Sequence, residues 1–428
     1  MRWPLGALVC LLAACSPTGS GRVLVVGLDG ATMDLVGPMM DEGRLPNLAR
    51  LARDGVSGRL ESQQPLLSPR VWTTIATGKM PSDHGIGGWV WSDPNGRIHL
   101  FESLHRRGAA LWNIASDAGL QVVTVNWLMT YPPEVINGVM VTDHALPAES
   151  EKRRKFADRF AKMAHNRGLD DEGTESAPLI LPTSWGKRLW PLLYSIKPLT
   201  HPNPFDTNEE LKGVALRLEL SHFYWNDQRA TRAALELEDE LHPDVLLVLL
   251  QGIDRVSHSL WGTLHPDTAP GLTKRQRQAG AKALRHYYEI ADSLVGRLVA
   301  RYDSRDLVMV ISDHGFEFVP GKGTHAWGGV HETDKALHGI LFARGAGLPR
   351  DRTAEGISVN DVTPTILAWL GLPVARDMVG QPLKQLEREV MYTESYDYIA
   401  IERVGEGRSG VEAEILQQLE ALGYIDRN

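Results

Sequence analysis

The feature that most constrains the fold is a run from Arg22 to Leu28 that is apolar after its first residue and ends directly in Asp29. An uninterrupted apolar run of this length is typical of a strand buried on both faces of a parallel sheet. Further runs of this kind occur at 121–125, 244–250, 307–311 and 340–343. Helical patterns lie between them, at 45–54, 103–119, 208–241, 274–302 and 361–370. The alternation predicts an α/β fold with a mostly parallel central sheet and helices on both faces.

The composition fits one large domain over residues 22–428. The chain has 428 residues, of which 43% are hydrophobic and 23% are charged, as in ordinary globular proteins. Its formal net charge of −8 argues against binding of nucleic acid as a polymer, which needs excess basic charge. Residues 149–207 break the strand–helix alternation, so we expect an insertion there that caps a site or forms a solvated excursion. The amphipathic pattern at 411–422 predicts a helix that packs on the domain.

Both cysteines of the chain, Cys10 and Cys15, lie before the predicted domain. Disulfides, cysteine-ligated zinc and thiol nucleophiles are therefore excluded from the folded part. Residues 1–14 have the basic end and short apolar core of a signal peptide, and residues 12–15 resemble the bacterial lipobox. We expect a lipid anchor at Cys15 with residues 15–21 as a tether. Ser16 after the cysteine favours the periplasmic side of the outer membrane, and the alternative is an ordinary secretory leader.

Three predicted strands run into an acidic residue, at Asp29, Asp254 and Asp313. Ligands bind at the carboxyl ends of strands in open α/β sheets, so these aspartates are expected to converge. His258 follows Asp254 by four residues and His314 follows Asp313 directly. Crowded carboxylates repel one another unless a cation lies between them. Aspartate and histidine without cysteine suit zinc, with manganese as the alternative, although each aspartate could instead cap a helix or form a turn.

Three more histidines precede the last predicted strand, namely His325, His331 and His338. A histidine in a loop is usually a surface residue, so not all three are expected to be ligands. Trp89, Trp91 and Trp327 are aromatic candidates for the wall of a leaving-group pocket, although core packing explains tryptophans equally well.

Ser68 stands where a loop leads into a predicted helix. The positive end of a helix dipole and its exposed N–H groups favour phosphate there. Ser68 could serve only as a helix cap. A serine of the triad type is poorly supported because no Gly-x-Ser-x-Gly motif surrounds it.

These residues carry a family resemblance. The chain resembles the alkaline phosphatase superfamily, and most closely its type I phosphodiesterase/nucleotide pyrophosphatase branch. The motifs that carry it are ordered along nearly the whole chain, at 27–30, 43–48, 68–78, 81–86, 254–258, 312–315, 361–365, 371–373 and 380–383. The ordered set is specific, whereas each motif alone is modest.

The resemblance implies two divalent metal ions, zinc or manganese, in a site that cleaves a small phosphate ester. It implies that one ion is held by Asp29, Ser68, Asp313 and His314. The other would be held by Asp254, His258 and a third histidine, for which we favour His331 over His338 and His325. Ser68 would attack phosphorus and form a phosphoseryl intermediate that water then releases.

The chain also departs from the family pattern. Nucleotide pyrophosphatases usually carry threonine at the nucleophile and an asparagine further on, where this chain has Ser68 and no asparagine in the segment that follows. Arg70 could replace that amide as an oxyanion donor, or could be an ordinary surface arginine. Leu67 stands where sulfatases need the cysteine or serine that becomes formylglycine, which disfavours that chemistry.

Three functions therefore remain open. The first is a lipid-anchored metallohydrolase of phosphodiesters or pyrophosphates. The second is a phosphomonoesterase or sulfatase-like hydrolase on the same metals. The third is a metal-binding lipoprotein without catalytic activity. The sequence does not indicate an oligomeric state.

Overall fold

The computed structural model describes residues 21–146, 177–206, 209–211, 217–265, 271–322, 327–405, 415–416 and 419–420. The predicted signal peptide and lipobox lie outside these residues, as does most of the helix predicted at 411–422. No helix in the described ranges is both long enough and apolar enough to cross a membrane.

Nine strands of the described residues form one mixed sheet in the order β11-β2-β10-β9-β1-β8-β5-β6-β7. Its centre is parallel, from β9 through β1, β8 and β5 to β6. The bounds are β1 Val23–Leu28, β2 Val56–Glu61, β5 Val122–Trp127, β6 Gly138–Thr142, β7 Ile180–Leu181, β8 Val245–Leu250, β9 Leu307–Ile311, β10 His338–Arg344 and β11 Arg352–Ser358. Two small sheets lie outside it, β3 (Val90–Ser92) with β4 (Ile98–Leu100), and β12 (Val374–Ala375) with β13 (Tyr392–Thr393).

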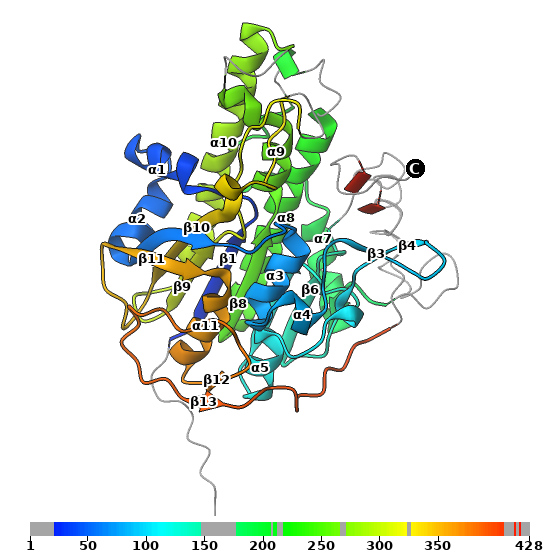
Figure 1. The fold of residues 1–428 in the computed structure, drawn as a ribbon, viewed down its shortest axis with the longest axis vertical. Coiled ribbons are helices and arrows are strands. Elements are labelled where there is room, and N and C mark those ends of the chain that lie inside the picture. The colour runs from blue at the N-terminus through cyan, green and yellow to red at the C-terminus, as the bar shows by residue number, and fades with distance from the viewer. Residues whose placement is uncertain are drawn as a thin grey trace, which may run out of the picture.

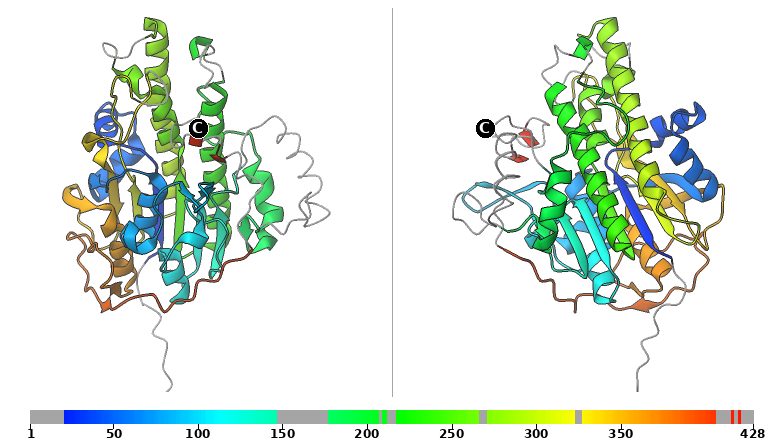
Figure 2. Two further views of the ribbon diagram at one scale, coloured as in Figure 1. Left: turned by 45° about the vertical axis from the view of Figure 1, so that its right-hand side comes forward. Right: turned by 180° about the vertical axis from the view of Figure 1, so that it is seen from behind.

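Helices cover both faces of the sheet, as expected (Figure 1). Along β1, Leu24 and Val26 point into the core of one face and Val23 and Val25 into the core of the other, as the two-residue period of a strand requires. The first face carries α1 Met33–Asp41, α2 Pro46–Asp54, α7 Gly186–Leu193, α8 Arg217–Leu241, α9 Gly252–Leu260 and α10 Lys274–Val299. The second face carries α3 Ser68–Thr77, α5 Leu111–Asp117 and α11 Val362–Leu370. The short helix α4 (Pro81–His84) follows α3. Figure 2 shows α8 and α10 extending beyond the sheet on one side.

All five strands expected from apolar runs are present, and the α/β fold is confirmed. Two details of the expectation were wrong. The strand at 340–343 belongs to β10, which runs antiparallel to both β9 and β2. The pattern at 103–119 does not form one helix, because a 3-10 turn at Ser103–His105 is separated from α5 by Gly108, whose φ of 77° is left-handed.

The segment 149–207 is described only from residue 177 on. There β7 extends the large sheet as an antiparallel partner of β6, and α7 packs against α8. Residues 149–176 lie outside the described part, so a cap over the site stays a prediction.

The C-terminal segment after α11 runs along one edge of the molecule (Figures 1 and 2). Val135, just before β6, donates its backbone N–H to Glu402, and Val404 donates to Pro133. These contacts place residues 402–404 at the amino-terminal end of β6. The opposite edge, where β1, β8 and β9 end, is therefore the one left to the predicted site.

Candidate active site

Asp29, Asp254 and Asp313 converge at the carboxyl edge of the sheet, as expected. Asp29 comes directly after β1, and Asp313 comes after β9 with Ser312 between them. Asp254 lies in the first turn of α9, the helix that follows β8. Because β1 lies between β8 and β9, the three carboxylates come from neighbouring strands. All three side chains are buried. Gly30 is required beside them, since its φ is 72° and a Cβ there would lie 3.0 Å from the Asp254 Cα.

Ser68 faces this cluster rather than capping its own helix. It is the first residue of α3, whose N-cap is Leu67, and no side-chain cap bond is formed there. Its hydroxyl donates to Asp29 Oδ1 at 3.3 Å and lies 3.5 Å from His314 Nε2. The capping alternative for Ser68 is therefore wrong, and its oxygen belongs to the group of acidic and histidine side chains.

Asp29 is fixed from its other side by Trp72, one turn further along α3. The indole Nε1 of Trp72 donates to Asp29 Oδ2 at 3.2 Å. Gly27 makes room for this ring, because a Cβ at Gly27 would lie 2.6 Å from the Trp72 Cη2. The glycine of β1 and the tryptophan of α3 thus set the orientation of the Asp29 carboxylate.

His314 lies at the centre of the cluster. Its Nδ1 contacts the carbonyl of Gly315 at 3.0 Å, which fixes the tautomer with the proton on Nδ1. Its Nε2 lies 3.4 Å from Asp313 Oδ2, 3.6 Å from Asp29 Oδ1 and 3.9 Å from Asp254 Oδ1. A histidine that donates through one nitrogen to a carbonyl and presents the other to carboxylates is arranged as a metal ligand.

Asp254 and His258 lie on consecutive turns of α9, with His258 Nε2 at 3.4 Å from Asp254 Oδ1.

Asp227 of α8 holds the start of α9, since its carboxylate accepts the backbone N–H groups of Gln251 and Gly252 and the hydroxyl of Tyr287. Burial raises the pKa of Asp227 to about 7. Sequence reasoning missed Asp227, which is remote along the chain from the helix that it caps.

Among the three histidines considered for the last position, the structure brings His331 into the cluster. His331 is buried, and its ring stacks on His314 with 4.2 Å between centroids and meets the edge of His258 at 5.0 Å. Burial, followed by the charges of His314 and His258, lowers the pKa of His331 well below its usual value. His338 begins β10 beside Glu61 and forms part of no ligand group among the described residues. His325 lies outside the described residues.

The donor atoms form two overlapping groups that fit divalent metals. Asp29, Asp313 and His314 offer atoms within 4.8 Å of one another, and so do Asp254, His314 and His331. Among the described residues, no hydrogen bond reaches Asp254 Oδ1 or Asp313 Oδ2, although both oxygens are buried. Buried carboxylate oxygens of this kind are expected to coordinate a cation.

The carboxylates of Asp29, Asp254 and Asp313 are close enough to shift one another's pKa values. Burial, then the charges of Asp313 and Asp254, raises the pKa of Asp29 well above its usual value. Burial and the charge of Asp254 raise the pKa of Asp313 to about 8. Burial also opposes ionisation of Asp254, but the attraction of His258 and of Arg255 outweighs it and lowers the Asp254 pKa. A divalent cation would relieve this repulsion.

Arg70 does not turn toward the cluster in the described contacts. Its Nη2 donates to the carbonyl of Gln64 at 3.2 Å. The arginine that does contact the cluster is Arg255, whose Nε lies 3.7 Å from Asp254 Oδ2. Sequence reasoning missed Arg255, although it directly follows a predicted ligand, because an arginine next to an aspartate is by itself uninformative.

The three tryptophans considered for a pocket lie in different places. Trp89 lines a pocket of about 100 Å³ that also includes Arg255. Trp91, on β3, stacks on His99 with 4.8 Å between centroids. Trp327 packs against the core.

The mostly parallel sheet, with aspartate and histidine side chains gathered at its carboxyl edge, places this protein in the class of α/β proteins with the alkaline phosphatase-like fold. Within it, the chain belongs to the type I phosphodiesterase / nucleotide pyrophosphatase family, whose model matches residues 23–361. No curated protein sequence matches the chain at a significant level.

Solved structures agree with this fold. The alkaline phosphatase PafA is 12% identical, with a TM-score of 0.52, over 86% of this chain and 99% of that one. A 2-O GAG sulfatase is also 12% identical, with a TM-score of 0.53, over 90% of this chain and 81% of that one. A phosphonoacetate hydrolase from Sinorhizobium meliloti 1021 is 18% identical with a TM-score of 0.42, and the match covers 70% of this chain but only 57% of the hydrolase. At these identities the likenesses to PafA and to the 2-O GAG sulfatase show the fold alone.

Proposed function

We propose that this protein hydrolyses phosphodiester or pyrophosphate bonds of small molecules through a phosphoseryl intermediate at Ser68. The observation that carries the proposal is that the buried Ser68 hydroxyl faces Asp29 and His314 instead of capping α3. A serine that lacks a triad needs another source of activation, and a metal cluster supplies one.

Two divalent ions, zinc or manganese, would be held by the side chains of the two groups together with Ser68 and His258, and His314, which belongs to both groups, would bind one of the ions. Asp29, Asp313, His314 and Ser68 would hold one, and Asp254, His258 and His331 would hold the other. When bound, the ions would supply Lewis-acid activation and neutralise the charge that develops on the phosphoryl oxygens.

The residues of the chain position the nucleophile. In the described geometry the Ser68 proton lies on its hydrogen bond to Asp29 Oδ1. Attack by Oγ on phosphorus forms the Ser68–phosphorus bond and breaks the bond to the leaving-group oxygen, and water then cleaves the phosphoserine. The positive end of the α3 dipole favours the charge on the phosphoryl group. Its first-turn N–H groups contribute little, because Arg70 and Val71 donate theirs to Leu67.

The test uses the chain from residue 16 onward, assayed with bis-p-nitrophenyl phosphate and p-nitrophenyl phosphate, with and without chelator. We expect faster cleavage of the diester, loss with chelator and recovery with Zn²⁺ or Mn²⁺. Ser68→Ala should abolish turnover, whereas Ser92→Ala, an exposed serine of β3, should retain it. Mass spectrometry of acid-quenched reactions should find phosphate on Ser68 of the wild-type protein.

The other outcomes identify the remaining functions. Preference for the monoester would establish a phosphomonoesterase, and cleavage of p-nitrophenyl sulfate a sulfatase-like enzyme. Bound metal without turnover of any of these esters would establish a metal-binding protein without catalytic activity. Full activity of Ser68→Ala would contradict the phosphoseryl mechanism.

We further propose that a lipid on Cys15 anchors the domain to the periplasmic side of the outer membrane. The support is the lipobox-like sequence at 12–15, followed by Ser16. The full-length protein should sediment with outer-membrane vesicles, and Cys15→Ala should release it. Recovery of Cys15→Ala in the same membrane fraction would overturn this anchor.

A further inference from the structure

A pocket of about 100 Å³ adjoins the cluster of predicted metal ligands through Arg255, which lines the pocket and contacts Asp254. Its wall includes Gln251, Gly252 and Arg255, the residues that flank the predicted ligand Asp254 in the chain. The rest of the wall comes from Trp89, Leu100 and Phe101, from the ends of β5 and β6, from α8 and from two C-terminal residues, Ile415 and Leu419. A group bound here would lie next to the reacting phosphorus without occupying the metal ligands.

The pocket combines aromatic walls with one guanidinium. Trp89, Phe101 and Phe223 supply rings, and Arg255 supplies the positive charge. The Arg255 guanidinium lies 5.2 Å from the Trp89 ring and 6.0 Å from the Phe223 ring, which are cation–π distances. Its Nε lies 3.7 Å from Asp254 Oδ2, so the side chain is held between the rings and the cluster.

The two carboxylates that line the same pocket accept hydrogen bonds from other parts of the protein. Asp143 accepts the backbone N–H groups of Met129, Thr130 and Tyr131. Asp227 accepts two N–H groups at the start of α9 and the hydroxyl of Tyr287. Both carboxylates are thus turned toward backbone and tyrosine donors, whereas Arg255 is the positively charged side chain that lines the pocket.

Backbone strain supports a binding role for this wall. Four non-glycine residues of the described part have a left-handed φ, and two of them, Asn126 at 58° and Met129 at 62°, line the pocket. Such conformations are disfavoured and occur preferentially at functional sites. The Asn126 side chain donates to the carbonyl of Leu249, and the bonds to Asp143 hold the turn at Met129. The wall is thus fixed before a ligand arrives.

We propose that this pocket receives the leaving group of the substrate and that Arg255 binds a second oxyanion carried by that leaving group. The assignment rests on the proposed function and narrows it to esters whose leaving group has a flat or apolar body and its own negative charge. A guanidinium binds a planar oxyanion with two parallel hydrogen bonds, and the rings would pack against the body that carries it.

A matched pair of substrates tests the proposal, namely 4-carboxyphenyl methyl phosphate and 4-carbamoylphenyl methyl phosphate. They are matched in size and shape and differ chiefly in the charge of the group that would reach Arg255. We expect the wild-type protein to prefer the carboxylate in kcat/KM by about tenfold or more, as a charge-assisted hydrogen bond implies. Arg255→Gln should bring the ratio close to one by slowing only the carboxylate, and Arg255→Lys should keep part of it.

A binding measurement accompanies the kinetics. Calorimetry should show that 4-hydroxybenzoate binds the wild-type protein at least tenfold more tightly than 4-hydroxybenzamide, and that Arg255→Gln removes this difference. Arg344→Gln is the control, because Arg344 lies at the other end of the sheet, where it donates to the carbonyls of Tyr302 and Asp303. It should retain both preferences.

Equal kcat/KM for the two esters, or an equal loss of both in Arg255→Gln, would overturn the proposal. The second result would place Arg255 on the transferred phosphoryl group or in support of Asp254. Cleavage of neither ester by the wild-type protein would contradict the proposed function. The leaving-group pocket would then be decided by calorimetry, where equal binding of the two phenols overturns it and preferential binding lost in Arg255→Gln supports it.

Discussion

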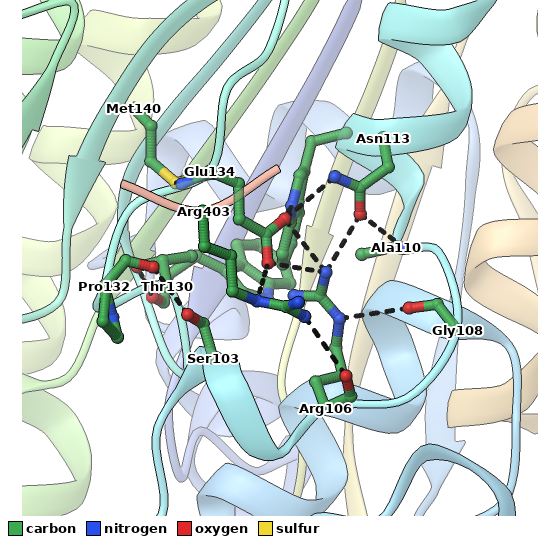
Figure 3. Close-up of polar contacts among 12 residues, drawn as sticks. Ser103, Arg106, Gly108, Ala110, Asn113, Thr130, Pro132, Glu134, Met140 and Arg403 are labelled. Carbon is green, nitrogen blue, oxygen red and sulfur yellow. Dashed lines mark hydrogen bonds and ion pairs between the residues drawn. The ribbon is translucent and has the colours of Figure 1, made fainter. Parts of the chain in front are cut away.

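Arg106 Nη2 lies 2.8 Å and 2.9 Å from the two carboxylate oxygens of Glu134, and both side chains are buried (Figure 3). Trp112 and Asn113 of α5 donate to the same carboxylate at 2.7 Å and 2.8 Å. Arg403, from the C-terminal segment, approaches Glu134 Oε1 at 3.5 Å and donates to the backbone carbonyl of Arg106. One buried carboxylate therefore joins α5, the segment before β6 and the C-terminal segment.

Glu134→Gln should strongly destabilise the fold. The substitution leaves the Arg106 guanidinium buried without a carboxylate, and breaking a buried pair in this way costs about 3–5 kcal/mol. Urea unfolding should show this loss in the free energy of unfolding. Arg188→Gln, which removes an exposed ion pair with Glu236, should change stability little. A loss no greater than that of the control would contradict a structural role for Glu134.

Gly252→Ala should destabilise the protein and weaken metal binding, although alanine usually favours a helix. A Cβ at Gly252 would lie 1.8 Å from the Tyr287 hydroxyl and 2.5 Å from Asp227 Oδ2. The start of α9, which carries Asp254 and His258, would have to shift. Thermal unfolding and zinc titration measure the two effects.

Two variants control that prediction. Gly37→Ala in α1 places a Cβ with no neighbour within 4 Å apart from its chain neighbours, but Pro38 follows it and opposes the helix preference of alanine, so the free energy of unfolding should change by less than about 1 kcal/mol. Gly252→Ala with Tyr287→Phe removes the nearest clashing atom and should recover part of the loss. No recovery in the double variant would show that the clashes it leaves, with Asp227 Oδ2 and with Cζ of the ring at position 287, decide the position of α9.

The central strands and most of the candidate site could be predicted because their signals are local. An apolar run that ends in aspartate identifies Asp29 and Asp313, and the i, i+4 spacing of Asp254 and His258 places both on one face of a helix. The ordered motifs then place Ser68 beside them. The structure agrees with each of these local expectations.

The contacts that hold the site could not be predicted, because they join residues remote in sequence. Asp227 caps α9 from the interior of α8, where an aspartate has no distinctive pattern. The antiparallel direction of β10 depends on its pairing with β2, a strand in which buried residues alternate with half-buried and exposed ones and which therefore gives a weak signal. Arg255 becomes informative only when Trp89 and Phe223 are seen around it.

Stability should fall as the pH falls from about 6.5 toward 3, in part because of His84. Burial, with the charges of Arg70 and Arg106, lowers the pKa of His84 to about 3. Its Nδ1 accepts the N–H of Ile86 and its Nε2 contacts the Thr74 hydroxyl, so the ring is held neutral. The unfolded chain binds a proton that the folded chain does not, and each pH unit in this window costs up to about 1.4 kcal/mol.

His84→Gln should reduce this dependence by about one proton, measured as the slope of unfolding free energy against pH between 4 and 6. Part of the slope should remain, because burial, with the charges of Arg229 and Arg255, also lowers the pKa of His222 to about 3. A slope unchanged in His84→Gln would show that His84 does not supply it. The slope itself is the readout, so a destabilised variant remains informative.

Removal of metal should lower the melting temperature. Asp29, Asp254 and Asp313 crowd their carboxylates around His314, and a divalent ion that binds only the folded chain stabilises it by about 2.7 kcal/mol at a hundredfold excess over Kd. Zn²⁺ or Mn²⁺ added to chelator-treated protein should therefore raise the midpoint of thermal unfolding by several degrees. Asp313→Asn should lose most of that rise.

A comparison of variants distinguishes zinc bound at the cluster from zinc bound elsewhere on the protein. Asp34→Asn changes an exposed carboxylate of α1 and should leave the rise intact. His286 is a surface histidine whose Nδ1 contacts Glu289 at 2.6 Å, and it offers added zinc a ligand outside the cluster. His286→Gln should therefore be tested beside Asp313→Asn. A rise that disappears in His286→Gln and persists in Asp313→Asn would place the stabilising ion on that surface instead of at the carboxyl edge of the sheet.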